Sequence, residues 1–490
     1  MRKIFTLLFL TTLFFNCSSD DSNDVLTDDD GITDEDNTLL TISRGAGTIP
    51  GFSDEVKDFT VEAIITDEEG IILTRSFLEF DSEIKLEAEY DKSKTYDLHF
   101  VERYLESNTS NPEFSYEDVL TYNVITLLDV KNRLYTYDAY SQDTINSLTK
   151  TGNVELEFNN IPSYSSGILG YSYGGAFSTI EGVLDNTETL DVSIGINSTN
   201  TVYCFVGSEE ESDIRFIKEE LTDGQSLVFN FEEMSKTTPI DIEFPPLNNQ
   251  TKLPFFYAYS INGFDESSNT RAVLADKSIF DNYFSSAERV FIPNNAFEKY
   301  TISSIIDYSN FIVETRRVYD NIDEISKKHI PSSLNAEITN NSFPNVQAKV
   351  SGEYDYFVVG SYYNDGADFY SDTKRLKWTI YGEASSEISI RQKNLVSNLI
   401  LEKDNFEIPS SDLIDSMWLT VLNSGAIINY DNYINYVINR NMFTDIGGQN
   451  IDRWTSKNFD NKATKKGTEN MERPDLWEYT GLDLENEYFK

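Results

Sequence analysis

Histidine is scarce in this chain of 490 residues, which contains only His99 and His329. A zinc site of the usual kind needs several histidine or cysteine ligands at close spacing, and the chain has no histidine pair at such spacing. It also has no glycine-rich loop of the type that holds phosphate groups. We therefore expect neither a metal site nor a cofactor. His99 lies in the alternating run YDLHF, which favours a strand position that is on the surface or partly buried.

Long apolar runs are missing as well. The stretch from Ile4 to Phe15 follows Arg2 and Lys3 and covers about 12 residues, whereas a helix that spans a bilayer needs about 20. Its length and its basic start are typical of the core of a signal peptide. No later stretch is long and apolar enough to span a bilayer, so a lasting membrane attachment would have to come through lipid.

Cysteine occurs only twice, and the first, Cys17, ends the apolar stretch. The run LFFNC at 13–17 resembles the bacterial lipobox, in which the cysteine thiol is alkylated with diacylglycerol and the chain is cut just before it. The leucine lies one position further from the cysteine than usual, and Asn16 is larger than the usual small residue. The resemblance implies a signal peptide over residues 1–16 and lipidation at Cys17, with acyl chains as the anchor. The alternative is an ordinary secretory signal followed by an unmodified cysteine.

The second cysteine, Cys204, lies in the strand-like run VYCFV. Once Cys17 is acylated, Cys204 has no partner for an intrachain disulfide, so apolar burial must stabilise the fold. Its apolar neighbours favour a buried thiol over a reactive one.

Basic residues are few: 39 Lys and Arg stand against 83 Asp and Glu, which gives a net charge of −44. Such a molecule repels nucleic-acid backbones and bare anionic surfaces, so we expect no nucleic-acid partner. The segment from Ser18 to Asn37 carries nine acidic and no basic residues, which predicts a lipidated, disordered acidic tether over residues 17–45. Its first four residues, SSDD, resemble the acidic signal that sends lipoproteins of Bacteroidota-type bacteria to the cell surface. A spacer without a sorting role is the alternative.

Hydrophobic residues recur mostly with the period of β-strands. In the run EIKLEAEY at 83–90, apolar residues alternate with charged ones, as in a half-buried strand. The same alternation occurs in VELEF at 154–158, LVFNF at 227–231 and IDIEF at 240–244. The sequence therefore predicts an all-β protein made of several antiparallel β-sandwich domains of immunoglobulin-like type, in series after the tether.

Two polar segments are expected to form turns between strands, TDEEG at 66–70 and TDGQ at 222–225. Helical periodicity is limited to short pieces near 432–440 and around Ala287. We predict four units, which are a β domain (46–150), two β-sandwich domains (151–245 and 246–345) and a β-rich C-terminal domain with a loop-like tail (346–490).

A faint internal repeat underlies this division. VELEF and GYSYGG, which starts at 170, are followed 86 and 88 residues later by IDIEF and AYSING. That spacing is about the size of an immunoglobulin-like unit, although chance similarity among β-rich segments is the alternative. The whole arrangement resembles uncharacterised surface lipoproteins of flavobacterial type.

One segment has the pattern of a catalytic motif. GYSYG at 170–174 resembles the GxSxG turn of α/β-hydrolases, and this would make Ser172 a nucleophile with His329 as its base and Asp320 or Asp323 as the acid. The segment lacks a long preceding apolar strand, and its surroundings lack the alternation of strands and helices of that fold. We therefore expect a structural role for Ser172 and no catalysis, with a serine hydrolase as the alternative.

The four tryptophans all fall in the last quarter of the chain, at Trp378, Trp418, Trp454 and Trp477. Flat aromatic faces on loops bind sugars and peptides, but packing in the core or at domain junctions is the stronger expectation.

These observations together predict a binding or scaffolding protein of the outer membrane. It would be anchored by lipid at Cys17 and would face the cell exterior. Its ligand would be a glycan or an envelope protein, and the sequence does not indicate which residues bind it. A structural subunit of an outer-membrane complex is a further alternative.

Overall fold

The protein is all-β, as predicted, and its described part contains β-strands of 3 to 23 residues together with the 3₁₀ helices η1 (Phe231–Glu233) and η2 (Ile322–Glu324). The computed structural model describes residues 38–44, 56–79, 81–88, 91, 94–106, 119–130, 134–137, 151–173, 176–195, 200–243, 256–265, 270–280, 287–308, 311–325, 332–342, 345–364, 374–390, 416–424, 430 and 450–456.

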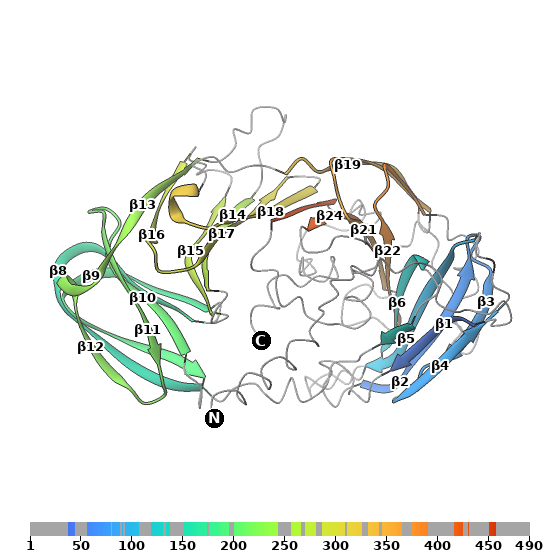
Figure 1. Cartoon of the computed structure of the whole chain (residues 1–490), viewed down its shortest axis with the longest axis horizontal. Coiled ribbons are helices and arrows are strands. Elements are labelled where there is room, and N and C mark those ends of the chain that lie inside the picture. The colour runs from blue at the N-terminus through green and yellow to red at the C-terminus, as the bar shows by residue number, and fades with distance from the viewer. Residues whose placement is uncertain are drawn as a thin grey trace, which may run out of the picture.

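A twelve-stranded sheet forms most of an arch (Figure 1). Its strands, in spatial order, are β15 (Thr270–Phe280), β14 (Phe256–Asp265), β17 (Lys299–Asp307), β18 (Phe311–Tyr319), β25 (Ile451–Ser456), β24 (Ser416–Ser424), β21 (Tyr356–Asn364), β22 (Lys374–Glu383), β6 (Val119–Val130), β5 (Tyr96–Glu106), β2 (Val56–Asp67) and β3 (Ile72–Phe77). Neighbouring strands are antiparallel except for β22 and β6, which are parallel.

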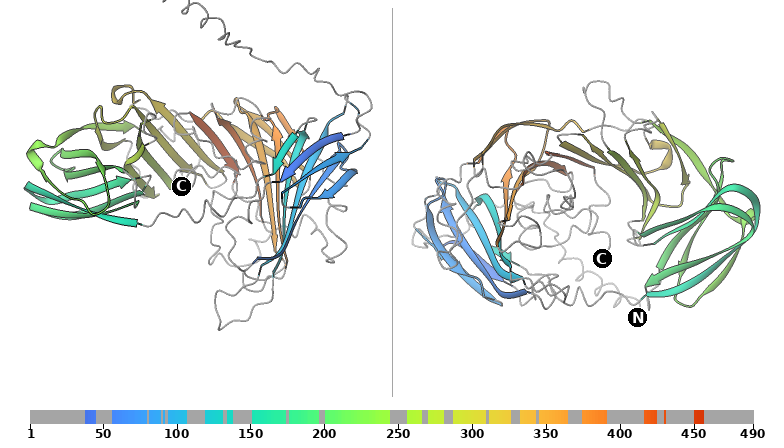
Figure 2. Two further views of the ribbon diagram at one scale, coloured as in Figure 1. Left: turned by 60° about the horizontal axis from the view of Figure 1, so that its bottom comes forward. Right: turned by 180° about the vertical axis from the view of Figure 1, so that it is seen from behind.

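A seven-stranded sheet lies at one end of the arch, and the N-terminal strands lie at the other (Figure 2). The seven-stranded sheet contains β8 (Thr151–Tyr173), β9 (Ala176–Gly195), β10 (Asn200–Ser208), β11 (Asp213–Leu221), β12 (Ser226–Asn230), β13 (Ser235–Glu243) and β16 (Ala287–Pro293).

The long hairpin of β8 and β9 organises this sheet. Its register shifts at three places between Asn159 and Gly167, and such irregularities bend a strand. The first half of β8 pairs with β12 and the second half with β10. Both halves contribute to one hydrophobic core, in which Val154 and Phe158 pack with Cys204.

Two small sheets cover faces of the large one. The first contains β4 (Ser82–Glu87), β1 (Thr38–Arg44) and β7 (Leu134–Tyr137), and its Ile42 and Leu86 pack with Phe100 of β5. The second contains β19 (Asn335–Ser342), β20 (Asn345–Ser351) and β23 (Glu387–Ser389), and its Val346 and Ile388 pack with Trp378 of β22.

Several sequence predictions are confirmed by these elements. In β4 the predicted apolar face turns inward, with Leu86 buried, while Glu83, Lys85 and Glu87 are exposed. The alternating run at 154–158 lies in β8 with its three apolar side chains fully buried. TDEEG joins β2 to β3, where the Asp67 carboxylate accepts hydrogen bonds from the amides of Glu69 (3.0 Å) and Ile71 (2.9 Å).

The predicted helical piece around Ala287 is wrong. Ala287 begins β16, which pairs along its length with β13 and buries Val290 and Ile292. Strand pairing and burial of β-branched side chains therefore override the weak helical pattern. The other predicted helical piece, near 432–440, lies outside the described residues.

The internal repeat does not correspond to a structural repeat. The described residues of its first copy lie within one strand, β8, whereas those of the second copy are divided between β13 and β14, which belong to different sheets.

The hydrogen-bonded sheets cross the predicted domain boundaries. The large sheet takes strands from units 46–150, 246–345 and 346–490, and β16 of unit 246–345 extends the sheet of unit 151–245. Pairing of this kind satisfies backbone groups that separate sandwiches would leave open at their edges. The four-unit division and the immunoglobulin-like topology remain predictions.

Candidate binding cavity

Ser172, the candidate nucleophile, lies in the interior of the molecule. It occupies a central strand, where it pairs with Phe177 of β9 on one side and with Tyr203 of β10 on the other. Its side chain is fully buried, and its Oγ accepts a hydrogen bond of 2.7 Å from the amide of Val273 in β15. The hydroxyl thus links the seven-stranded sheet to the end of the twelve-stranded sheet.

Gly170, two residues before Ser172, makes room for the aromatic ring of Phe205. A Cβ atom at Gly170 would lie 2.5 Å from Cζ of Phe205 and 2.6 Å from the carbonyl oxygen of Ser178. Because contacts this short are not tolerated, only glycine allows Phe205 to lie over β8. Gly170 and Ser172 therefore lie on one face of the strand, where their small size leaves space for neighbouring side chains. This is a packing reason for the GxS part of the motif.

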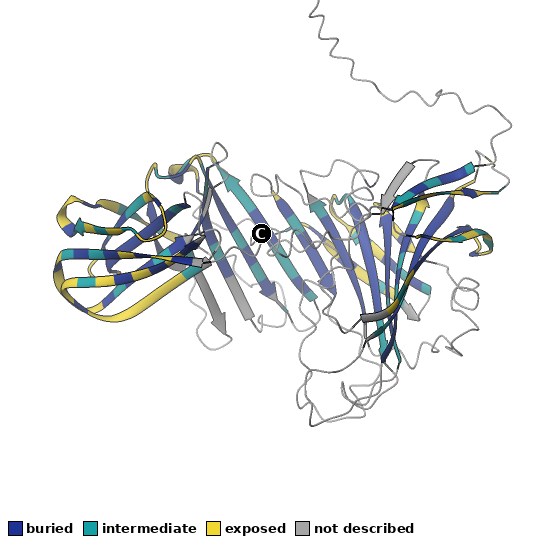
Figure 3. Ribbon diagram, turned by 90° about the horizontal axis from the view of Figure 1, so that it is seen from below, coloured by how far each residue is buried: buried dark blue, intermediate teal, exposed yellow. Residues whose placement is uncertain are grey.

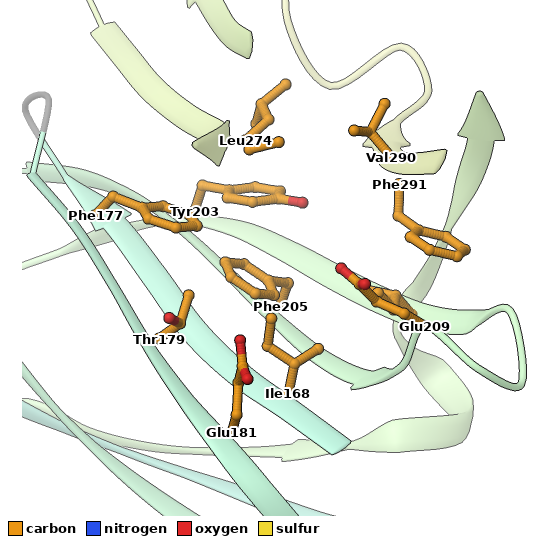
Figure 4. Close-up of a pocket in the computed structure, with 12 residues that line it drawn as sticks. Ile168, Phe177, Thr179, Glu181, Tyr203, Phe205, Glu209, Leu274, Val290 and Phe291 are labelled. Atoms are coloured by element: carbon orange, nitrogen blue, oxygen red, sulfur yellow. The ribbon is translucent and has the colours of Figure 1, made fainter. Parts of the chain in front are cut away.

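That face is the floor of a cavity of about 180 Å³ (Figure 4). Three cross-strand rows build the floor, each with one residue from β9, β8 and β10: Phe177, Ser172 and Tyr203; Thr179, Gly170 and Phe205; and Glu181, Ile168 and Gly207. Residues in such rows point to the same side of a sheet.

The floor is strongly aromatic. The rings of Phe177 and Phe205 are stacked, with centroids 5.8 Å apart and planes 17° apart. Tyr203 packs against Phe205 at 5.7 Å, and burial raises the pKa of its phenol, so it stays neutral. Leu274 of β15 and Val290 of β16 line the opposite wall.

Two carboxylate side chains, Glu181 and Glu209, complete the lining (Figure 4). Both residues are exposed, as is Thr179, so the cavity opens to solvent along β9 and the turn after β10. An apolar, aromatic cavity with a few polar groups at its mouth is the usual composition of a small-ligand site.

A partly buried ion pair fixes the two sheets close to this cavity. Lys218 of β11 pairs with Asp265 of β14, and its Nζ also donates to the carbonyl of Ala296 at 2.6 Å. The same ammonium group lies 4.4 Å from the ring centroid of Phe297, a favourable cation–π distance. Because Phe297 also packs against Tyr203, these contacts hold the floor of the cavity in a fixed position relative to the opposite wall.

The edge of the cavity is the exposed strand β9. One side of β9 pairs with β8, and on the other side it pairs with no strand within the described part of the chain. Residues 178–183 are all exposed, and Ile180 and Val183 expose 54% and 75% of their surface. Figure 3 shows exposed residues gathered at this end of the arch.

The other residues that the sequence marked as candidates lie elsewhere. His99 is fully buried, more than predicted, and its ring nitrogens lie 2.8 Å from Oγ1 of Thr126 and 3.0 Å from Oγ1 of Thr66. Burial lowers its pKa to about 3, so the ring is neutral. Trp378 donates to the same Thr126 hydroxyl at 2.8 Å.

Cys204 is a buried thiol, as predicted, and burial raises its pKa, which disfavours the reactive thiolate. Trp378, Trp418 and Trp454 are buried as expected and offer no exposed aromatic face.

Three further candidates, Cys17, His329 and Trp477, lie outside the described residues. The two candidate acids of the triad are both exposed: Asp320 precedes η2 and Asp323 lies within it.

Within the described part of the chain, no group of three or more His, Cys, Asp or Glu side chains is arranged to hold a metal ion. Nor does that part contain a helix with the length and apolar character needed to cross a membrane.

Comparison with known proteins does not assign the cavity. No protein-family model matches the chain, and no curated protein matches it significantly. Sequence reasoning missed Phe177, Glu181, Phe205 and Glu209 as site residues. The available signal was the pair of small residues, Gly170 and Ser172, at alternate positions of the strand.

Proposed function

We propose that this protein is a lipid-anchored binding protein of the outer cell envelope, whose ligand enters the cavity beside β9. The cavity is the observation that carries the proposal, because it combines an aromatic floor, two carboxylates at its mouth and an exposed edge strand. Its volume of about 180 Å³ is close to the size that accommodates a single benzene ring. A ligand would therefore insert one ring or one side chain.

The membrane anchor is part of the same proposal. Acylation of Cys17 would attach the protein to outer-membrane lipid, and the acidic segment 18–37 would hold the folded part away from the bilayer. The net charge of −44 disfavours nucleic acid and favours uncharged or basic ligands, so a glycan or an envelope protein is the expected class.

A serine hydrolase is the alternative function, and the surroundings of Ser172 do not favour it. Its hydroxyl is buried and already accepts a hydrogen bond from the amide of Val273. A nucleophilic serine instead needs a base within reach and a path for the substrate.

The test is ligand retention by a variant with a filled cavity. Thr179 is exposed and points into the cavity, whereas its neighbour Ser178 is exposed on the opposite face of β9. Thr179→Trp should fill the cavity without removing a core residue, and Ser178→Trp is the matched control.

Immobilised full-length protein would be offered envelope glycans and, separately, detergent-solubilised envelope proteins. We expect saturable retention of one class by the wild type and by Ser178→Trp, and its loss in Thr179→Trp. Equal retention by all three proteins would show that the ligand binds elsewhere.

A further inference from the structure

β9 differs from the other edge strands of the two large sheets. An exposed edge is normally protected by lysine, proline or a very short strand, because its open backbone groups pair readily with another chain. β3 carries Arg75, β15 carries Arg271 and Lys277, β16 ends at Pro293, and β12 has only 5 residues. β9 has 20 residues and contains no lysine, arginine or proline.

The charges along β9 are all of one sign. It carries four carboxylates, at Glu181, Asp185, Glu188 and Asp191, and Glu209 adds another at the cavity mouth. A strand pairing with this edge would place its side chains opposite these carboxylates, where opposite charges stabilise the pair and like charges destabilise it.

The two faces of β9 offer different surfaces to such a strand. On one face Thr179 and Glu181 border the aromatic cavity. On the other, Ile180 lies in the row of Leu169 and is half exposed. Side chains of an added strand would alternate between the cavity and this apolar surface.

We propose that β9 binds an extended basic segment of a partner protein, which adds as a strand along its open edge and places a lysine or arginine side chain in the cavity. This inference rests on the binding function proposed above. The aliphatic stem of that side chain packs on Phe177 and Phe205, and its charged end reaches Glu181 and Glu209 at the mouth. Apolar side chains in between cover Ile180 on the opposite face.

A second copy of this chain is the less favourable occupant. Pairing two β9 strands would bring their carboxylates together without any basic side chain from either strand.

The probe for this inference is an eight-residue peptide of alternating lysine and valine with blocked ends. Its control has the same sequence and charge but carries N-methyl groups on alternate backbone amides, which removes the donors needed for strand pairing. A second control replaces lysine by glutamate. Binding to the full-length protein would be measured by calorimetry at high salt, where general attraction to the acidic protein is screened.

We expect saturable binding of the lysine peptide, and a loss of about tenfold or more for the N-methylated peptide and for the Thr179→Trp protein. Glu181→Gln should weaken binding severalfold, whereas Glu219→Gln, at an exposed carboxylate of β11 outside β9, and Ser178→Trp should not. Unfolding curves like that of the wild type would show that the variants fold.

Three results with the peptides would overturn the inference. They are equal binding of the N-methylated peptide, binding of the glutamate peptide as tight as that of the lysine peptide, and no binding of the lysine peptide. A dimer of the full-length protein that Thr179→Trp abolishes would identify a second copy as the occupant and would also overturn it. If Thr179→Trp still abolished glycan retention in any of these cases, the proposed binding function would stand without the strand-addition mode.

Discussion

The hydroxyl oxygen of Ser172 lies 2.7 Å from the amide nitrogen of Val273, 101 positions further along the chain. The contact joins a central strand of one sheet to the edge strand of the other, at one end of the cavity. A serine in a sequence pattern typical of catalysis thus acts as a hydrogen-bond acceptor between sheets.

Ser172→Ala should reduce stability without affecting any hydrolytic activity. Removing the hydroxyl leaves the buried amide of Val273 without this acceptor, which costs about 1–3 kcal/mol. Urea unfolding would measure the loss, and Ser178→Ala at the neighbouring exposed position should be close to neutral. We expect no labelling of the wild type by a fluorophosphonate. Labelling that disappears in Ser172→Ala would support the hydrolase alternative.

Gly170→Ala should destabilise the protein, whereas Gly182→Ala should not. The added methyl group at Gly170 would collide with Phe205 and with the Ser178 carbonyl, while nothing lies within 4 Å of a Cβ at Gly182. Overpacking of this kind costs about 1–3 kcal/mol. Thermal unfolding of both variants would check the difference, and equal stabilities would contradict the packing account of this glycine.

The dependence of stability on pH should contain a contribution from His99. Its pKa is lowered from about 6.5 to about 3 by burial, so between these pH values the unfolded chain binds a proton that the folded chain does not. The free energy of unfolding should therefore fall as the pH drops through this window, by about 1.4 kcal/mol per pH unit.

His99→Gln removes the titrating imidazole and so tests its contribution to the free energy of unfolding. Between pH 6.5 and pH 5 the wild type should lose about 2 kcal/mol more than the variant, measured by urea unfolding at both pH values. Parallel losses in the two proteins would mean that His99 is protonated in the fold or that its site opens readily.

Cys17→Ala should release the protein from the membrane fraction. The reason is that the lipobox-like run at 13–17 provides the expected anchor, and acyl chains supply the free energy of attachment. Fractionation after a carbonate wash would check it, together with metabolic labelling by a palmitate analogue. A Cys17→Ala protein that stays in the membrane fraction would refute the lipoprotein prediction.

The strands were predictable because their alternation is local. Leu86 and Phe158 belong to runs whose apolar residues repeat every second position, and both are buried as that pattern predicts. The arrangement of the sheets was not predictable in this way, since pairings such as β6 with β22 join segments more than 240 residues apart. Nothing in either segment specifies its distant partner.

The cavity could be anticipated only in part. Gly170 and Ser172 are visible as small residues in a strand, but Phe205 and Val273 explain them only once the fold brings those residues close. For the same reason the sequence pattern predicted His99 to be on the surface or only partly buried, and not fully buried. Its hydroxyl partners, Thr66 and Thr126, come from the strands on either side of β5.

Photo-crosslinking in intact cells tests the central claim, ligand binding beside β9, most directly. A photoreactive phenylalanine analogue would replace Val183 on β9, which lies on the same side of the strand as Thr179 and Glu181, or, as the control, Val228 on β12, since both residues are exposed. We predict a discrete crosslinked product from position 183, identified by mass spectrometry as an envelope component and lost in the Thr179→Trp background. No product from position 183, or the same product from position 228, would contradict binding at this cavity.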